Sequence, residues 1–168
     1  MKRKIHTLTN IKTECQLVYS NAVHAGLNRV DSGDRNRGFV HDSLGNKSEF
    51  HFIPYRKILQ HSALFDSIES LTEKINLKDK VLTASILEFN PGDFLEWSEI
   101  ELWKQNTVAK FFSIALTSGN SIEFKDGVTQ VPQYTAIEFN TGDVHRKQPS
   151  SSKQTWLVLM IPDHFNLV

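Results

Sequence analysis

The chain has 168 residues, a length that fits one domain able to bury roughly two thirds of its unfolded surface. Lysine plus arginine equals aspartate plus glutamate at 19 each, which argues against the broad basic field that non-specific nucleic-acid binding needs. The single cysteine, Cys15, excludes an internal disulfide framework and fits a reducing compartment, and no apolar stretch approaches the length of a membrane span. We therefore expect one cytoplasmic domain, residues 1–168, that binds neither nucleic acid nor a membrane.

The first 80 residues carry two helical patterns separated by a polar stretch. Apolar residues recur at three- and four-residue steps over residues 11–25 and again over 62–75, which predicts two amphipathic helices. Residues 28–49 are rich in Asp, Asn, Gly, Ser and Arg, a composition typical of turns, and predict a long polar loop. Such a loop is either a lid over a site or a disordered surface segment. Residues 49–53 predict a short strand that Pro54 ends.

From residue 81 onward the hydrophobic period falls to two, and Gly- and Asn-rich turns separate short apolar runs. Eight strands are predicted, over residues 81–89, 94–97, 99–103, 108–117, 121–124, 128–131, 134–139 and 155–161. Eight short strands after N-terminal helices predict a mainly β fold, a jelly-roll or cupin-like barrel over residues 81–168, with residues 1–80 as a helical and loop brace.

The segment Phe139-Asn140-Thr141-Gly142-Asp143-Val144-His145 ends a strand in a polar turn and delivers one histidine to the mouth of the predicted barrel. Earlier in the chain, alternation along an acidic strand places Glu99 and Glu101 on one face. His145 and Glu99 can offer imidazole and oxygen ligands to a divalent metal ion. Alternatively, Glu99 belongs to a solvated acidic strand and His145 is a rim histidine bonded to a backbone carbonyl. His41 and His51 border the polar loop and are further candidates to complete the ligand set.

Residues 81–162 resemble the aspartyl/asparaginyl β-hydroxylase-like branch of the 2-oxoglutarate- and iron-dependent oxygenases, whose core is a double-stranded β-helix. The resemblance is carried, in chain order, by Leu87-Glu88-Phe89-Asn90-Pro91-Gly92, residues 110–119, Phe124-Lys125-Asp126-Gly127, residues 139–145, and Ser150-Ser151-Ser152-Lys153 with the closing strand. It implies this fold and, as cofactors, Fe(II) and 2-oxoglutarate.

Members of that branch hold iron with two histidines, sometimes with a carboxylate, and hold the co-substrate with basic residues on barrel strands. The resemblance places His145 on the second histidine and Glu99, or its neighbour Ser98, at the position of the first. It also places Lys110 on a strand position that binds the co-substrate. An arginine expected near Thr155 is replaced, and Arg146 and Lys153 are the cations near enough in sequence to substitute for it.

Three functions follow from these residues. The first is a divergent 2-oxoglutarate/Fe(II) oxygenase that hydroxylates a small molecule or a peptide side chain. The second is a catalytically degenerate barrel that acts as a binding or interaction module without metal. The third is a cupin-like isomerase or sugar-binding protein, because Gly142-Asp143-Val144-His145 also resembles the second cupin motif while paired histidines of the first are missing.

Overall fold

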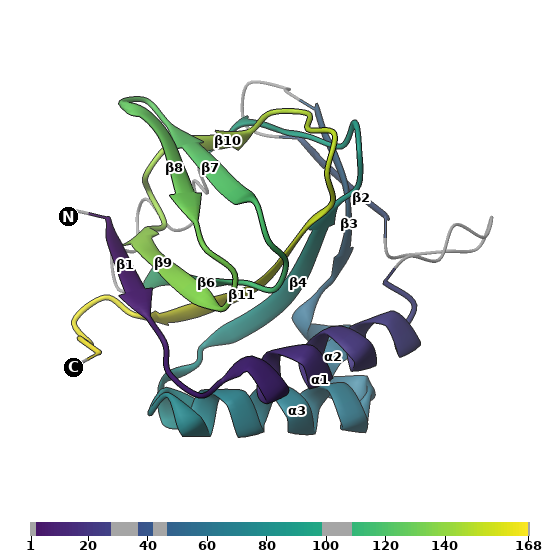
Figure 1. Cartoon of the computed structure of the whole chain (residues 1–168), viewed down its shortest axis with the longest axis vertical. Helices are drawn as coiled ribbons and strands as arrows, with labels where there is room; N and C mark the ends of the chain where they lie inside the picture. Colours follow the sequence, from purple (N-terminus) through teal and green to yellow (C-terminus); the bar gives the residue numbers. More distant parts are fainter. Residues whose placement is uncertain (1–2, 28–36, 42–46, 99–108, 168) are drawn as a thin grey trace.

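The computed structural model describes residues 3–27, 37–41, 47–98 and 109–167 of the chain. In this part of the chain, two antiparallel sheets face each other to form a barrel (Figure 1). The larger sheet has the strand order β1-β9-β6-β11-β4-β3-β2, and the smaller has the order β5-β10-β7-β8. The strands are β1 (Lys4–Thr7), β2 (Arg37–His41), β3 (Lys47–Ile53), β4 (Thr83–Phe89), β5 (Leu95–Ser98), β6 (Ala109–Ala115), β7 (Asn120–Phe124), β8 (Gly127–Val131), β9 (Thr135–Asn140), β10 (His145–Lys147) and β11 (Gln154–Pro162).

The helices cover the outer face of the larger sheet (Figure 1). They are α1 (Lys12–His24), α2 (Tyr55–Gln60) and α3 (Ser62–Lys74), followed by the 3-10 turn η1 (Lys78–Lys80). The buried residues of each long helix recur at helical spacing, so they form one apolar stripe, and this stripe packs against the sheet. Cys15 of α1 belongs to that stripe, and burial raises the pKa of its thiol to about 12. No helix among the described residues is long and apolar enough to span a membrane.

The central strands of the larger sheet separate two hydrophobic cores. On β6, Phe112 and Ile114 face the helices, whereas Phe111 and Ala115 face the barrel interior. The inner core also contains Trp156 from β11. Since successive side chains of a strand point to opposite faces, a strand between two cores is apolar on both. Every residue of β6 is buried, and β6 lies next to β11 near the centre of the larger sheet. These two strands therefore form the middle layer of the molecule.

Each long helix is followed, two residues after its last residue, by a residue in the left-handed backbone region. Gly26 has φ 94° and Asn76 has φ 61°, and these are the residues for which that region costs least. After each, a leucine amide reaches back to a helix carbonyl: Leu27 donates to Ala22 at 3.1 Å and Leu77 donates to Thr72 at 2.8 Å. These bonds satisfy carbonyls that the helix end leaves open, and both leucines are fully buried.

The mainly β, jelly-roll fold predicted from the sequence is confirmed, with several differences in detail. Residues 37–41 and 47–48, expected within a polar loop, belong to β2 and β3 and extend the larger sheet, and the strand predicted at 49–53 forms the rest of β3. The short strands β1 and β10 and the helix α2 were also not expected. β1 and β2 are edge strands, which need a partner on only one side and little apolar sequence. The predicted strand at 99–103, and the loop alternatives for 28–36 and 42–46, lie outside the described residues.

Candidate functional site

His145 is the first residue of β10, directly after the turn in which the Asp143 amide donates to the Asn140 carbonyl at 3.1 Å. Its ring lies inside the barrel against the rings of three phenylalanines. The centroid distances are 5.2 Å to Phe139, 6.2 Å to Phe111 and 6.3 Å to Phe124. All three rings belong to the inner core, so the turn delivers the imidazole to an apolar wall.

One ring nitrogen of His145 forms a hydrogen bond with the backbone of the preceding turn. Its Nδ1 lies 2.9 Å from the Asp143 carbonyl oxygen, which can only accept, so Nδ1 carries the proton. Burial lowers the pKa of His145, against an opposing effect of the Asp143 carbonyl and the Asp143 charge. The neutral imidazole then leaves the Nε2 lone pair available, which is the arrangement that metal-binding histidines use.

A metal site needs more than this one imidazole. The described residues contain no group of three His, Cys, Asp or Glu side chains placed to hold a metal ion. Ferrous iron in an oxygenase is held by a facial set of three protein ligands with open positions. The described donor set therefore does not fit iron. Glu99, the predicted partner of His145, lies outside the described residues, and its role stays a prediction.

The side chain of Lys110 lies on the helix side of β6, whereas His145 lies on the barrel side of this strand. Lys110 shares the helix side with Phe112 and Ile114, which pack against the helices. Its Nζ is 3.2 Å from Oε1 of Glu138 on β9, and His6 of β1 approaches the same oxygen at 3.6 Å. Lys110 and Glu138 are each 1% exposed. The structure thus places the predicted co-substrate residue in a buried ion pair and does not bring it together with His145.

Arg146 points out of the smaller sheet. Its Nη2 lies 2.7 Å from Oε2 of Glu123 on the neighbouring strand β7. The guanidinium also stacks on Trp97, 4.4 Å from the ring centroid. The pKa of Glu123 is lowered because the side chains of Gln148 and Arg146 both donate hydrogen bonds to its carboxylate. Arg146 therefore already has a carboxylate and an aromatic face as partners.

Lys153 lies on the helix side of the larger sheet. Its Nζ is 3.9 Å from Oε1 of Glu88, a fully buried carboxylate of β4. The other oxygen of Glu88 accepts from the hydroxyls of Thr155 at 2.8 Å and Tyr19 at 3.4 Å. All three predicted co-substrate cations, Lys110, Arg146 and Lys153, thus have carboxylate partners, and none shares the barrel interior with His145.

His51 also faces away from the interior. Its neighbours Phe50 and Phe52 pack in the inner core, so alternation turns His51 to the outer face, beside its cross-strand partner Glu88. Its Nδ1 lies 3.1 Å from Nδ2 of Asn90 and 3.7 Å from Oδ2 of Asp93. The side chain of His41 lies outside the described residues.

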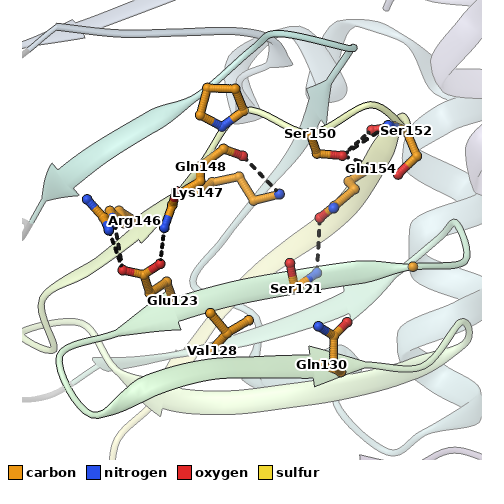
Figure 2. Close-up of a pocket in the computed structure, with 12 residues that line it drawn as sticks. Ser121, Glu123, Val128, Gln130, Arg146, Lys147, Gln148, Ser150, Ser152 and Gln154 are labelled. Carbon is orange, nitrogen blue, oxygen red and sulfur yellow. Dashed lines mark hydrogen bonds and ion pairs between the residues drawn. The ribbon is translucent and has the colours of Figure 1, made fainter.

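Sequence reasoning missed Lys147, two residues after His145. It is 7% exposed, and burial lowers the pKa of its ammonium. Its Nζ donates to the Gln148 carbonyl at 3.2 Å and has no carboxylate partner among the described residues. The register of β10 against β5 shifts between His145 and Lys147, so simple alternation along the strand does not predict the face on which Lys147 lies. Lys147 also lines a pocket of about 320 Å³ (Figure 2).

No family model matches the chain, and no curated protein sequence matches it. Solved structures do. The viral collagen prolyl hydroxylase of Paramecium Bursaria Chlorella virus-1, solved as a 2OG complex, has a TM-score of 0.57 at 13% identity, over 96% of this chain and 94% of that one. SnoK, a non-heme α-ketoglutarate-dependent carbocyclase of nogalamycin biosynthesis, has a TM-score of 0.64 at 12% identity, over 96% and 79%. The epimerase SnoN, α-ketoglutarate-dependent and from the same biosynthesis, has a TM-score of 0.62 at 8% identity, over 96% and 76%.

These identities are low, and the likeness concerns the fold. The described strands and helices follow the arrangement that these 2-oxoglutarate-dependent enzymes share, along nearly the whole chain. The chain therefore has the double-stranded β-helix, or jelly-roll, fold that these structures share. Function has to be argued from the site, because one fold hosts many activities.

Proposed function

We propose that this protein is a non-catalytic member of the oxygenase-like fold that binds a small organic ligand. One observation carries the proposal: the three cations predicted to bind 2-oxoglutarate are paired with carboxylates outside the barrel interior, while aromatic rings surround His145. Each of the three pairs would have to break before its cation could serve a co-substrate.

The barrel interior is a poor setting for a dianion. Beside His145 such a ligand would meet the rings of Phe111, Phe124 and Phe139. Moving an ionised carboxylate from water into an apolar site without a paired cation costs on the order of several kcal/mol. The lining therefore favours apolar packing over co-substrate binding at this place.

A second candidate is a divergent 2-oxoglutarate/Fe(II) oxygenase, and one observation favours it. The Asp143 carbonyl fixes the His145 tautomer with Nε2 as acceptor, as a ligating histidine requires. In this case Glu99 would be the second metal ligand, and the substrate would be a small molecule or a peptide side chain. This candidate function would also make the protein a member of the aspartyl/asparaginyl β-hydroxylase-like branch.

Thermal unfolding separates the two candidates. The purified protein is melted with manganese alone, with 2-oxoglutarate alone, with both, and with chelator. A ligand at about a hundred times its Kd stabilises by about 2.7 kcal/mol, which moves the midpoint of a domain of this size by several degrees. We expect no shift that requires both ligands.

A shift that requires both ligands, and that disappears in His145→Ala, would reject the proposal and establish the oxygenase candidate. His61→Ala is the matched control, since His61 lies at the start of α3, where its Nδ1 accepts from the Leu64 amide. A shift lost equally in both variants would indicate general destabilisation.

A further inference from the structure

A pocket opens where β10 and β7 separate (Figure 2). The two strands pair only at His145 with Phe124 and at Arg146 with Glu123. The chain then leaves β7 over residues 147–153 and returns with Gln154, whose Oε1 accepts from the Ser121 amide at 3.0 Å. The space between has a volume of about 320 Å³, the size of a small-ligand site.

Lys147 is the unusual group in this pocket. Its side chain is more than nine-tenths buried, and within the described part of the chain its ammonium has a single partner, the carbonyl of Gln148. An ammonium has three donors, and a lysine so enclosed is normally paired with a carboxylate. Figure 2 shows the Lys147 side chain pointing from β10 towards Ser150 and Gln154.

The other charges that line the pocket cancel. Arg146 and Glu123 form an ion pair, and Gln148 donates a further hydrogen bond to Glu123 (Figure 2). The Glu123 carboxylate therefore has two donors of its own and is not a partner of Lys147. The pocket carries a net charge of +1, which suits a ligand with one negative charge.

The rest of the lining is mostly neutral and polar. Hydroxyls and amides come from Ser121, Gln130, Ser150, Ser152 and Gln154, and Val128 and Pro149 are the apolar members. Ser150 and Ser152 already bond to each other, which holds this wall in place. Groups that both donate and accept complement ligand hydroxyls.

We propose that this pocket binds a small hydroxylated monocarboxylate, with the carboxylate on the Lys147 ammonium and the hydroxyls on the serine and glutamine side chains. The inference rests on the proposed function, to which it adds the site and the chemical class of the ligand. The pocket uses neither His145 nor a metal, so its test is independent of the manganese and 2-oxoglutarate experiment.

Three six-carbon probes separate the parts of this proposal. D-gluconate has the carboxylate and the hydroxyls, sorbitol has the hydroxyls without the carboxylate, and hexanoate has the carboxylate without the hydroxyls. Calorimetric titration of the full chain should show binding of gluconate that is at least about tenfold tighter than that of either other probe. Inorganic phosphate is the fourth probe and tests for a simple anion site.

Lys147→Met should weaken gluconate binding at least about tenfold, because it removes the cation and keeps most of the side-chain volume. Lys125→Met is the matched control: Lys125 is exposed on the same side of the smaller sheet, over Trp97, and does not line the pocket. That variant should bind gluconate as the wild type does. Circular dichroism verifies that both variants are folded.

Several results would overturn the proposal. These are no gluconate binding by the wild type, unchanged binding in Lys147→Met, an equal loss in Lys125→Met, or phosphate bound more tightly than gluconate. Failure here with no response to manganese and 2-oxoglutarate would reject this ligand and leave the proposed binding function standing. A joint response to those two ligands would reject the proposed function itself.

Discussion

His145 illustrates how one turn sets the chemistry of one side chain. The Asp143 carbonyl fixes its tautomer, and three phenylalanine rings exclude water from much of the imidazole. The sequence pointed to this histidine and to its position at the barrel mouth, and a backbone carbonyl as its partner was one of the alternatives drawn from it. What the sequence does not contain is the aromatic wall, which forms only when β6, β7 and β9 come together.

The lowered pKa of His145 has a consequence for stability. A group whose pKa is lower in the folded state stabilises the fold above its unfolded pKa of about 6.5, and this contribution is lost as the pH falls through the folded value. The wild type should therefore lose more stability between pH 7.5 and pH 5 than His145→Asn, which keeps a donor for Asp143 and does not titrate. Urea unfolding at both pH values measures the difference, and equal losses would contradict it.

The buried pair of Lys110 and Glu138 supports a second prediction. Glu138→Gln leaves an uncompensated ammonium in the core, which should cost about 3–5 kcal/mol of unfolding free energy. The double variant Lys110→Met with Glu138→Leu should recover most of that loss, since neither charge remains. Glu14→Gln, in the solvated pair with Lys74, is the control and should cost much less. Denaturant titration of the four proteins decides the matter.

The face on which Lys110 lies was not predictable from the sequence. Its strand reads Lys110-Phe111-Phe112-Ser113-Ile114-Ala115, and the apolar residues do not alternate because both faces are buried. Without alternation, the pattern cannot say which residues face the interior. The resemblance assigned Lys110 to a co-substrate position, and only the packing of Phe112 and Ile114 against the helices shows on which side its side chain lies.

At the scale of elements, both predicted helices are present before residue 81, and most of the strands predicted after it lie within a few residues of those in the structure, although β1, β2 and β3 also precede residue 81. The missed strands are β1 and β2, which lie at sheet edges, and β10, which has only three residues. β1 and β2 each contribute pairing along one side only, so neither needs the apolar run by which a strand is recognised in a sequence. Their partners, β9 and β3, are set by the tertiary fold, which local patterns do not encode.

The ends of the long helices give an element-scale prediction. Gly26 has a positive φ, and a side chain there is strained, so Gly26→Ala should lower the unfolding free energy by about 1 kcal/mol. Asn76→Gly should be close to neutral because asparagine already tolerates this backbone region. Thermal or urea unfolding of both variants measures the contrast. A loss at Asn76 as large as that at Gly26 would contradict the conformational explanation.

At the scale of the whole molecule, one sheet joins the helical layer to the barrel. Adjacent residues of β6 serve the two cores: Phe111 the inner and Phe112 the outer. Because both cores share this strand, neither layer can unfold while the other keeps its packing. The chain is therefore expected to unfold in one cooperative transition.

Two substitutions test this coupling. Phe111→Ala and Phe112→Ala should each cost about 3–5 kcal/mol, the usual loss for a buried phenylalanine. In both variants, unfolding followed by far-UV circular dichroism, which reports mainly on the helices, should coincide with unfolding followed by tryptophan fluorescence, to which Trp156 of the inner core contributes. Separate transitions in either variant would show that the layers unfold independently.

The two-sided burial of β11 also leaves a question of alignment. Its run from Trp156 to Ile161 is apolar on both faces, so a slip by one residue would still place apolar side chains in both cores. The polar end of the strand resolves this degeneracy. Thr155 donates to the buried Glu88 and to Thr117 Oγ1, and its carbonyl accepts from Asn120. A strand shifted by one residue would leave these buried polar groups without hydrogen-bond partners. The polar contacts of Thr155 therefore make one register of the apolar strand far more favourable than the neighbouring registers.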